Sequence, residues 1–201
     1  MLLKILKPLV EKLPLLARTY RYIRDYNGLY VKPEMSVHGF QWIGNERIKN
    51  GLTEPKEVKL VHNILKDVDL FINIGANQGL YTCIALSKGK KVIAFEPEPL
   101  NFNYLIQNIQ INNWADDIEA YPLAIGSKKG LSRLYGFSSG ASLIPGWAGV
   151  SKHSFKLVPT IRLDDLINEE LEEKNIFILA DIEGGEINML EGAKRFLELN
   201  N

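Results

Sequence analysis

The stretch that decides the fold is residues 71–79, Phe-Ile-Asn-Ile-Gly-Ala-Asn-Gln-Gly, an apolar run that ends in a turn bracketed by two glycines. The apolar segment 80–86 follows at once, so the pattern predicts a strand, a tight loop and the start of a helix. Glycine lets such a loop adopt positive φ and lets its backbone approach a ligand closely. The first N–H groups of the helix face whatever lies above the strand. In an open parallel sheet, this is where nucleotide-like ligands bind.

The bulk composition is that of one soluble domain. The chain has 201 residues, of which 46% are hydrophobic and 24% are charged, and its formal net charge is zero. A neutral chain has no global field that favours nucleic acid, so we expect no nucleic-acid partner. No apolar run approaches the roughly 20 residues that span a bilayer, and the N-terminus does not resemble a cleaved signal. We therefore expect a cytoplasmic protein.

Cysteine and histidine are sparse. Cys83 is the only cysteine, which excludes an internal disulfide and any multi-cysteine metal site. It lies among apolar residues and is expected to be a small core residue. The three histidines, His38, His62 and His153, have no metal-ligand spacing, so we expect no metal site.

Residues 1–53 are expected to form a helical or irregular N-terminal extension, followed by a Rossmann-like domain over residues 54–201. The first part is leucine-rich and basic, with Pro8 and Pro14 breaking it into short helices. Residues 1–24 could make weak contact with an anionic membrane surface. Packing on the domain or on a partner chain explains the same pattern, and an oligomer is compatible with it.

The downstream pattern alternates helices and strands. It predicts a helix from Pro55, strands at 68–74, 91–95 and 118–124, and helices at 80–88 and 99–112. This alternation predicts an α/β fold with a right-handed, mostly parallel sheet. Further on, we expect strands at 131–137, 156–163 and 176–180, an N-capped helix start at 164–166, and a closing helix at 187–197.

Glu96 ends the second strand of this pattern, 21 positions after Gly75. In nucleoside-binding sheets an acidic residue at this place accepts hydrogen bonds from the ribose hydroxyls. A dinucleotide loop usually needs a middle glycine because the pyrophosphate approaches the backbone closely, but Asn77 stands in that region here. S-adenosylmethionine carries no phosphate, so the loop favours a methyltransferase over a dehydrogenase. A Rossmann-like domain without a ligand is the remaining alternative.

Seven motifs in order carry a family resemblance that runs from about residue 51 to the C-terminus. They are Glu54-Pro55, residues 71–82, Ala94-Phe95-Glu96-Pro97, Asn101-Phe102, residues 123–126, residues 163–166 and residues 181–186. Together they resemble the FkbM-type S-adenosylmethionine-dependent methyltransferases. The resemblance implies the class I methyltransferase fold and O-methylation of a hydroxyl on a sugar or another secondary metabolite, with a small-molecule or glycan as acceptor.

The resemblance also implies a cofactor site. Gly75, Asn77 and Gly79 would line the methionine part of S-adenosylmethionine, and Glu96 would hold the ribose. Two further residues would lie near the adenine, namely Ala124 and Ile125. Asn73 would belong to the same site, at a position where the family usually has an aspartate that helps to attract the sulfonium and amino groups.

The acidic segment 181–186 is the expected catalytic element. Asp181 ends a strand beside the glycine loop, so its carboxylate is expected to point into the same crevice and to orient or deprotonate an acceptor hydroxyl. Glu183 is a second catalytic candidate, with Glu186 as an alternative. Capping of the following helix is the competing interpretation, because acidic residues favour a helix start.

Three departures from the family pattern support a second hypothesis. Asn73 replaces the usual aspartate, Leu179 stands where a lysine is common, and the sequence ends one helix after Asp181. We therefore expect a sheet that lacks its C-terminal strands and leaves strand 176–181 near an edge. The alternative function is a degenerate or truncated domain that acts as a non-enzymatic binding or assembly module.

Overall fold

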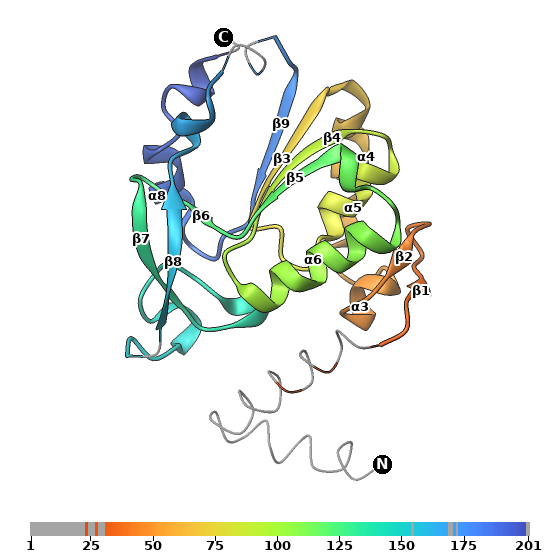
Figure 1. The fold of residues 1–201 in the computed structure, drawn as a ribbon, viewed down its shortest axis with the longest axis horizontal. Helices are drawn as coiled ribbons and strands as arrows, with labels where there is room; N and C mark the ends of the chain where they lie inside the picture. Colours follow the sequence, from red (N-terminus) through yellow and green to blue (C-terminus); the bar gives the residue numbers. More distant parts are fainter. Residues whose placement is uncertain are drawn as a thin grey trace.

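The computed structural model describes residues 31–153, 155–168, 171 and 173–199, together with Ile23 and Asn27. Its centre is a four-stranded parallel sheet with the order β5-β4-β3-β9 (Figure 1). The strands are β3 (Leu70–Ile74), β4 (Lys91–Phe95), β5 (Ile118–Tyr121) and β9 (Ile176–Ala180). The chain moves outward from β3 to β5 and then returns to the other side of β3. This is the predicted Rossmann-like α/β fold, and its ligand crevice is expected beyond the carboxyl ends of the strands where the order reverses.

Three helices cover one face of this sheet (Figure 1), namely α4 (Pro55–Ile64), α5 (Leu80–Ser87) and α6 (Pro99–Ile111). Their apolar side chains form one core cluster with Phe71 and Val92 of the sheet. Cys83 belongs to this cluster and is 0% exposed, which confirms that it is a small core residue. Phe40 and Trp42 join the same cluster from the N-terminal segment, which contains β1 (Glu34–Met35), β2 (Gln41–Trp42) and α3 (Glu46–Lys49).

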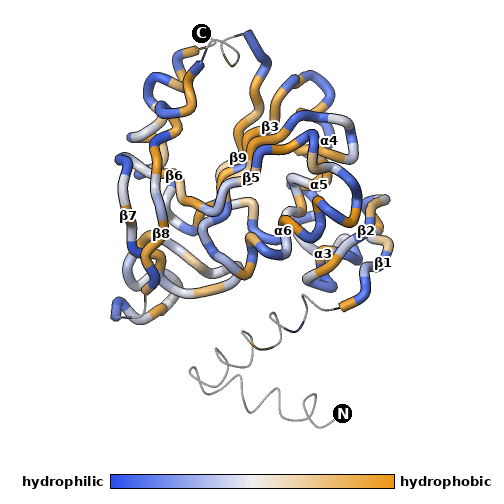
Figure 2. Tube along the Cα trace, in the orientation of Figure 1, coloured by the Kyte–Doolittle hydropathy of each residue, from blue (hydrophilic) through white to orange (hydrophobic). Residues whose placement is uncertain are grey.

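The opposite face of the sheet packs against the C-terminal part of the chain. Leu70, Ile72 and Ile74 form a second core cluster with side chains from η5 (Leu163–Leu166), α8 (Glu186–Glu191) and η6 (Phe196–Glu198). Both faces of the central strands are therefore covered, and Figure 2 shows these strands as hydrophobic segments. Among the described strands, β9 pairs only with β3 and stands at the edge of the sheet, as expected.

A smaller sheet stands beside the main one (Figure 1). It has the order β6-β8-β7, with β6 (Ala124–Ile125) parallel to β8 (Phe155–Ile161) and β7 (Gly130–Tyr135) antiparallel to it. A 2.6 Å ion pair between Lys156 of β8 and the buried Glu98 at the start of α6 ties the two parts together. Because Glu98 also caps α6 by accepting from the N–H groups of Leu100 and Asn101, it is fixed from two directions.

Two predicted elements have different bounds in the structure. The strand expected at 118–124 divides into β5 and β6, which belong to different sheets. Pro122 has no N–H to donate to a ladder, and a turn forms in which the Leu123 N–H donates to the Tyr121 carbonyl at 2.9 Å. The helix expected at 187–197 ends at Glu191, with Gly192 as its C-cap residue. Gly192 lies so close to the Gly126 carbonyl that a Cβ atom would be 2.0 Å from that oxygen.

The helix start expected at 164–166 is also wrong, since these residues lie inside the short 3-10 turn η5. The Asp164 carboxylate accepts from the Phe196 N–H at 2.9 Å, and Asp165 accepts from the Arg162 N–H. Both aspartates therefore accept from backbone N–H groups, as the pattern suggested. Asp165 does so within its own turn, whereas Asp164 bonds to the first residue of η6, 32 positions later in the chain.

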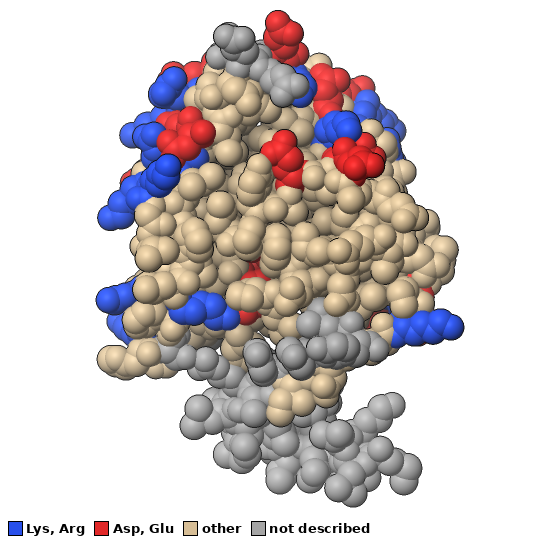
Figure 3. Space-filling model, viewed as in Figure 1, with Lys and Arg blue, Asp and Glu red and all other residues tan. Residues whose placement is uncertain are grey.

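The predicted basic segment 1–24 lies outside the described residues except for Ile23. None of the helices in the described part of the chain is both long enough and apolar enough to span a bilayer. On the face shown in Figure 3, the charged side chains of the described residues lie above and below a largely uncharged middle band. That face therefore presents no continuous positive surface.

Candidate functional site

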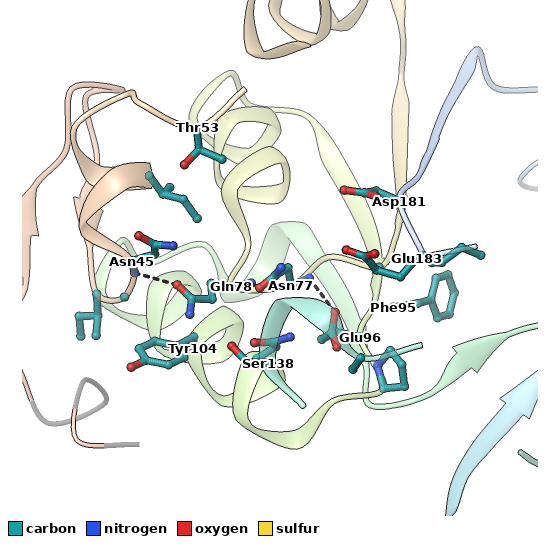
Figure 4. Close-up of a pocket in the computed structure, with 18 of the residues that line it drawn as sticks. Asn45, Thr53, Asn77, Gln78, Phe95, Glu96, Tyr104, Ser138, Asp181 and Glu183 are labelled. Atoms are coloured by element: carbon teal, nitrogen blue, oxygen red, sulfur yellow. Dashed lines mark hydrogen bonds between the residues drawn. The ribbon is translucent and has the colours of Figure 1, made fainter. Parts of the chain in front are cut away.

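A cavity of about 1200 Å³ opens beyond the carboxyl ends of β3, β4 and β9. It exceeds the roughly 300–1000 Å³ of ordinary ligand pockets, which leaves room for more than one bound molecule. Its walls include the glycine loop after β3, the end of β4 with β6, and the turn after β9. The start of α6, the loop after β7 and the N-terminal segment around 42–54 also line it. Figure 4 shows Asp181 and Glu183 on one side, Asn45 and Thr53 on the other, and Asn77 between them.

The glycine loop is held tightly against its neighbours. The N–H groups of Gly75 and Ala76 both donate to the Phe95 carbonyl at 2.9 Å. Gly75 has φ of +83°, and a Cβ atom there would lie 2.1 Å from the Asp181 carbonyl oxygen, so only glycine fits. Asn77 also has positive φ, +52°, a conformation that asparagine tolerates better than most residues. Gly75 and Asn77, two of the predicted cofactor residues, both line the cavity.

Two predicted cofactor residues do not line the cavity. Gly79 faces α6 instead, where a Cβ atom would lie 2.8 Å from Leu105, so this glycine allows α5 and α6 to pack closely. Asn73 is 1% exposed, and its Nδ2 donates to the Thr82 hydroxyl of α5 at 2.9 Å. Its Oδ1 has no hydrogen-bond partner among the described residues. Side chains alternate along a strand, so Asn73 shares the helix-covered face of β3 with Phe71.

Glu96 is the most constrained acidic group of the site. It is 5% exposed, and its two carboxylate oxygens accept from the backbone N–H groups of Asn77 at 2.7 Å and Glu98 at 2.8 Å (Figure 4). Burial raises its pKa to about 7, although these hydrogen bonds and one from the Asn101 side chain favour the charged form. A carboxylate has about four acceptor positions. Glu96 therefore keeps acceptor capacity at the wall of the cavity that it lines.

An apolar wall lies next to Glu96. Ala124 and Ile125 of β6, which were predicted to lie near the adenine, are buried and line the cavity. Phe95 and Leu123 line it as well. Asn101 lines the same region with 2% exposure, and its Oδ1 has no partner within the described residues. A flat, largely apolar group with a few polar edges would suit this wall.

The acidic turn after β9 brings Asp181 and Glu183 to the cavity but not Glu186. The Asp181 N–H donates to the Ile74 carbonyl at 3.0 Å, which continues the β3–β9 ladder to the mouth of the site. The Asp181 side chain is accessible, yet partial burial and the nearby carboxylates of Glu54, Glu183 and Glu186 raise its pKa. Glu186 accepts from the N–H groups of Ile182 and Gly184 in the turn before α8, so it closes this turn and does not cap the helix, whose N-cap residue is Gly185.

Glu183 also has structural partners. Its Oε2 accepts from the Trp147 indole at 2.7 Å, and its carbonyl accepts from the Ser142 hydroxyl at 2.6 Å. Its φ is +53°, and the following Gly184 lies directly under the Trp147 ring. Glu183 thus joins the turn after β9 to the loop between β7 and β8, while one face of its side chain still lines the cavity.

The sequence analysis missed the N-terminal wall. Asn108 and Asn112, one helical turn apart on α6, bond the backbone of residues 41–43 in the manner of a neighbouring strand. Each accepts from a backbone N–H and donates to the carbonyl of the same residue, Ile43 or Gln41, at 2.8–3.0 Å. Asn45 then donates its N–H to the Gln78 side chain of the glycine loop (Figure 4). Residues 43–54 are thereby placed across the cavity from Asp181.

Glu54 is the acidic residue of this wall. It stands just before α4 with φ of +46°, and its carboxylate accepts from the Tyr81 hydroxyl at 2.6 Å. In the sequence, Glu54 belongs to one of the seven motifs, but the motif alone assigns it no role. Among the described residues, no group of histidine, cysteine and acidic side chains has the arrangement of a metal site.

Comparison with known proteins gives one family match. The sequence pattern of the "Methyltransferase FkbM domain" matches residues 73–200. The hexuronic acid methyltransferase AglP of Haloferax volcanii is 27% identical over 158 residues, which are 77% of this chain and 62% of that protein. The chain therefore spans less than two thirds of the length of this relative.

Two solved structures are also similar. The methyltransferase FkbM from Methylobacillus flagellatus is 25% identical, with a TM-score of 0.42 over 63% of this chain and 29% of that one. TYW2 of P. horikoshii, in complex with MeSAdo, is 24% identical, with a TM-score of 0.38 over 47% of this chain and 36% of that one.

Proposed function

Because the chain belongs to the FkbM methyltransferase family, we propose that it uses S-adenosylmethionine to methylate a hydroxyl group of a sugar or a related small molecule. The observation that carries the proposal is Glu96. This carboxylate follows β4, lies beside the glycine loop and keeps about one acceptor position at the cavity wall. A ribose hydroxyl can donate to this position through a charge-assisted hydrogen bond.

The residues around Glu96 fit the rest of the cofactor. Ala124 and Ile125 offer the apolar wall that an adenine ring requires, and Asn101 adds an unpaired acceptor near it. Gly75 lets the loop pack directly on the backbone of Asp181, since no Cβ atom fits there, and this packing brings the loop and the turn after β9 to the same cavity. When bound, S-adenosylmethionine supplies a methyl group that the adjacent sulfonium charge makes electrophilic.

Asp181 is the residue that we assign to the acceptor. Its carboxylate stands at the carboxyl end of β9, on the cavity wall next to Gly75. Its raised pKa makes it a stronger base than an ordinary aspartate, so it can take the proton of an acceptor hydroxyl. Positioning supplies much of the rate of an in-line displacement, and the fixed backbone of this turn serves that purpose.

The acceptor is expected to lie between Asp181 and the N-terminal wall. Asn45 and Thr53 offer amide and hydroxyl groups there, which suit a hydroxyl-rich molecule (Figure 4). The relative AglP is named for a hexuronic acid, so a sugar acid is the first acceptor to test.

Calorimetric titration with S-adenosylhomocysteine tests the cofactor assignment. We expect binding to the native chain and a loss of about tenfold or more in Glu96→Ala, because a charge-assisted bond to the ribose disappears. Glu119→Ala, which removes an exposed carboxyl of β5 outside the cavity, is the matched control. Absence of binding at millimolar ligand would refute the proposal. Transfer of labelled methyl groups to hexuronic acids, with neutral hexoses alongside, then tests the acceptor class.

A further inference from the structure

The methionine end of the cofactor raises a question of charge. That end carries a cationic amino group, and the side chain at position 73 offers it no negative charge. Asn73 is neutral, buried and turned toward Thr82 on the helix-covered face of β3. An aspartate at this position would follow the same strand alternation and would face the same helix. If the amino group has an anionic partner in this protein, other residues must supply it.

The cavity places two carboxylates where they can do so. Asp181 touches the glycine loop through its backbone, and Glu54 lies on the wall formed by the start of α4. The two are close enough for the Glu54 charge to raise the pKa of Asp181. The other charged groups that act on Asp181 are also carboxylates, Glu183 and Glu186. This part of the cavity is therefore electronegative, and a cation entering it would relieve the repulsion.

The Glu54 side chain is held by a residue of α5 and not by its own helix. It occupies the N-cap position of α4, yet its side chain makes no capping hydrogen bond. Its Oε2 instead accepts from the Tyr81 hydroxyl at 2.6 Å, and Tyr81 lies in the first turn of α5, directly after the glycine loop. Burial and this hydrogen bond raise the pKa of Tyr81, so the hydroxyl remains a donor and holds one oxygen of Glu54 in a fixed position.

The cationic side chains of the N-terminal wall do not cancel this charge. Lys49 lines the cavity but is bonded to Glu34 at 2.6 Å and to Glu46 at 2.8 Å. Arg47 donates to the Leu52 carbonyl at 3.2 Å. Lys32 also lines the cavity, and none of these three cations is among the groups that shift the pKa of Asp181.

We propose that Glu54, held by Tyr81 and facing the same space as Asp181, binds the cationic amino group of the cofactor's methionine end. The inference rests on the proposed function, since it concerns the same ligand. It assigns a binding role to a residue of the N-terminal wall, and it couples cofactor binding to the placement of that wall.

Two nucleoside ligands distinguish binding of the amino group by Glu54 from a general effect of the substitution on the fold. S-adenosylhomocysteine has the amino acid end, whereas 5′-methylthioadenosine has the same nucleoside and a thioether without it. By calorimetry, we expect Glu54→Gln to weaken S-adenosylhomocysteine about tenfold and to leave 5′-methylthioadenosine unchanged, because only the first ligand brings an amino group. Tyr81→Phe should cause a smaller loss that is again confined to S-adenosylhomocysteine, since Glu54 keeps its charge but loses its anchor. Glu57→Gln, on the same helix but outside the cavity, should change neither affinity.

The outcomes are distinct. If Glu54→Gln weakens both ligands equally, or neither, Glu54 does not bind the amino group and the inference is wrong. A fall in methyl transfer with both affinities unchanged would place Glu54 on the acceptor and would also overturn it. If the native chain binds neither nucleoside, the proposed function itself fails. If it binds both with the same affinity, only the contact to the amino acid end is excluded.

Discussion

The buried carboxyl of Glu96 should make the stability of this protein depend on pH in an unusual direction. In the unfolded chain it titrates near 4.5, and in the folded protein burial raises its pKa to about 7. The folded state therefore binds more protons than the unfolded state between these two values. Stability is then full below pH 4.5 and falls as pH rises through 7.

The size of the effect follows from the two pKa values. A pKa difference of one corresponds to about 1.4 kcal/mol, so the difference for Glu96 amounts to about 3 kcal/mol. Because Glu96 is only 5% exposed, solvent screening reduces this figure little. Ordinary carboxylates, which are stabilised when ionised, act in the opposite direction.

Glu96→Gln isolates this contribution. Glutamine keeps the shape of the protonated acid and does not titrate, so its other effects on stability are constant with pH. We expect the free energy of unfolding of the variant to gain about 3 kcal/mol relative to the native chain between pH 4.5 and pH 8. Urea unfolding of both proteins at four or five pH values measures this difference, and the titration of Asp181 cancels because both proteins contain it.

Ligand binding provides a second test of the same group. If ribose hydroxyls donate to ionised Glu96, the affinity for S-adenosylhomocysteine should rise with pH and level off above about 7, while Glu96→Gln should bind weakly at every pH. A stability difference that stays constant within about 0.5 kcal/mol over the whole range would contradict the raised pKa. The carboxylate would then be ionised throughout, and the argument from its burial would be wrong.

Three further substitutions test the packing around the site. Asn73→Asp should cost about 3 kcal/mol of stability, because it buries a charge. It should not improve the affinity for S-adenosylhomocysteine, because the side chain does not line the cavity. Tighter binding would contradict this placement of the side chain. Asn108→Ala should lower the free energy of unfolding by about 2–4 kcal/mol, since it leaves buried backbone groups unpaired. A loss below about 1 kcal/mol would show that contacts other than the Asn108 hydrogen bonds hold the N-terminal wall. Gly184→Ala should lose about 1–3 kcal/mol from positive φ and from contact with Trp147. Gly89→Ala has similar φ and an open surrounding, so it measures the backbone part alone, and equal losses would exclude the Trp147 contact.

Much of the fold can be predicted from local patterns. The strand, the glycine loop and α5 follow from residues 71–86, and the alternation of helices and strands predicts the parallel sheet. The glycine at 75 is needed for a contact with Asp181, which comes more than 100 residues later in the chain. Local signals sufficed here because the loop conformation itself requires glycine, whatever the distant contact is.

The position of Asn73 could not be predicted because strand β3 is buried on both faces. Alternation of apolar and polar residues indicates which face is which, but residues 70–74 are apolar except for Asn73 itself. The N-terminal wall escaped detection for another reason. Asn108 and Asn112 bond to the backbone groups of Ile43 and Gln41, and these bonds place no requirement on the side chains at positions 41 and 43. The signal lay at the end of α6, where Asn108 and Asn112 stand one turn apart. The helix carries other amide side chains as well, so this pair does not stand out in the sequence.

The structure also changes how the departure at position 73 is interpreted. The sequence alone suggests that a neutral residue at position 73 weakens the attraction of the site for a cationic ligand. The structure shows that this side chain does not reach the cavity. The negative charge near the glycine loop comes from Asp181 and Glu54, which belong to different layers of the fold. Glu54 lines the cavity because the bond to Tyr81 and the bonds to α6 hold residues 41–54 against it. Affinity for a cationic ligand should therefore depend on the docking of this segment as much as on the glycine loop. Asn108→Ala, measured with S-adenosylhomocysteine at a temperature where it remains folded, should weaken binding even though Asn108 does not line the site.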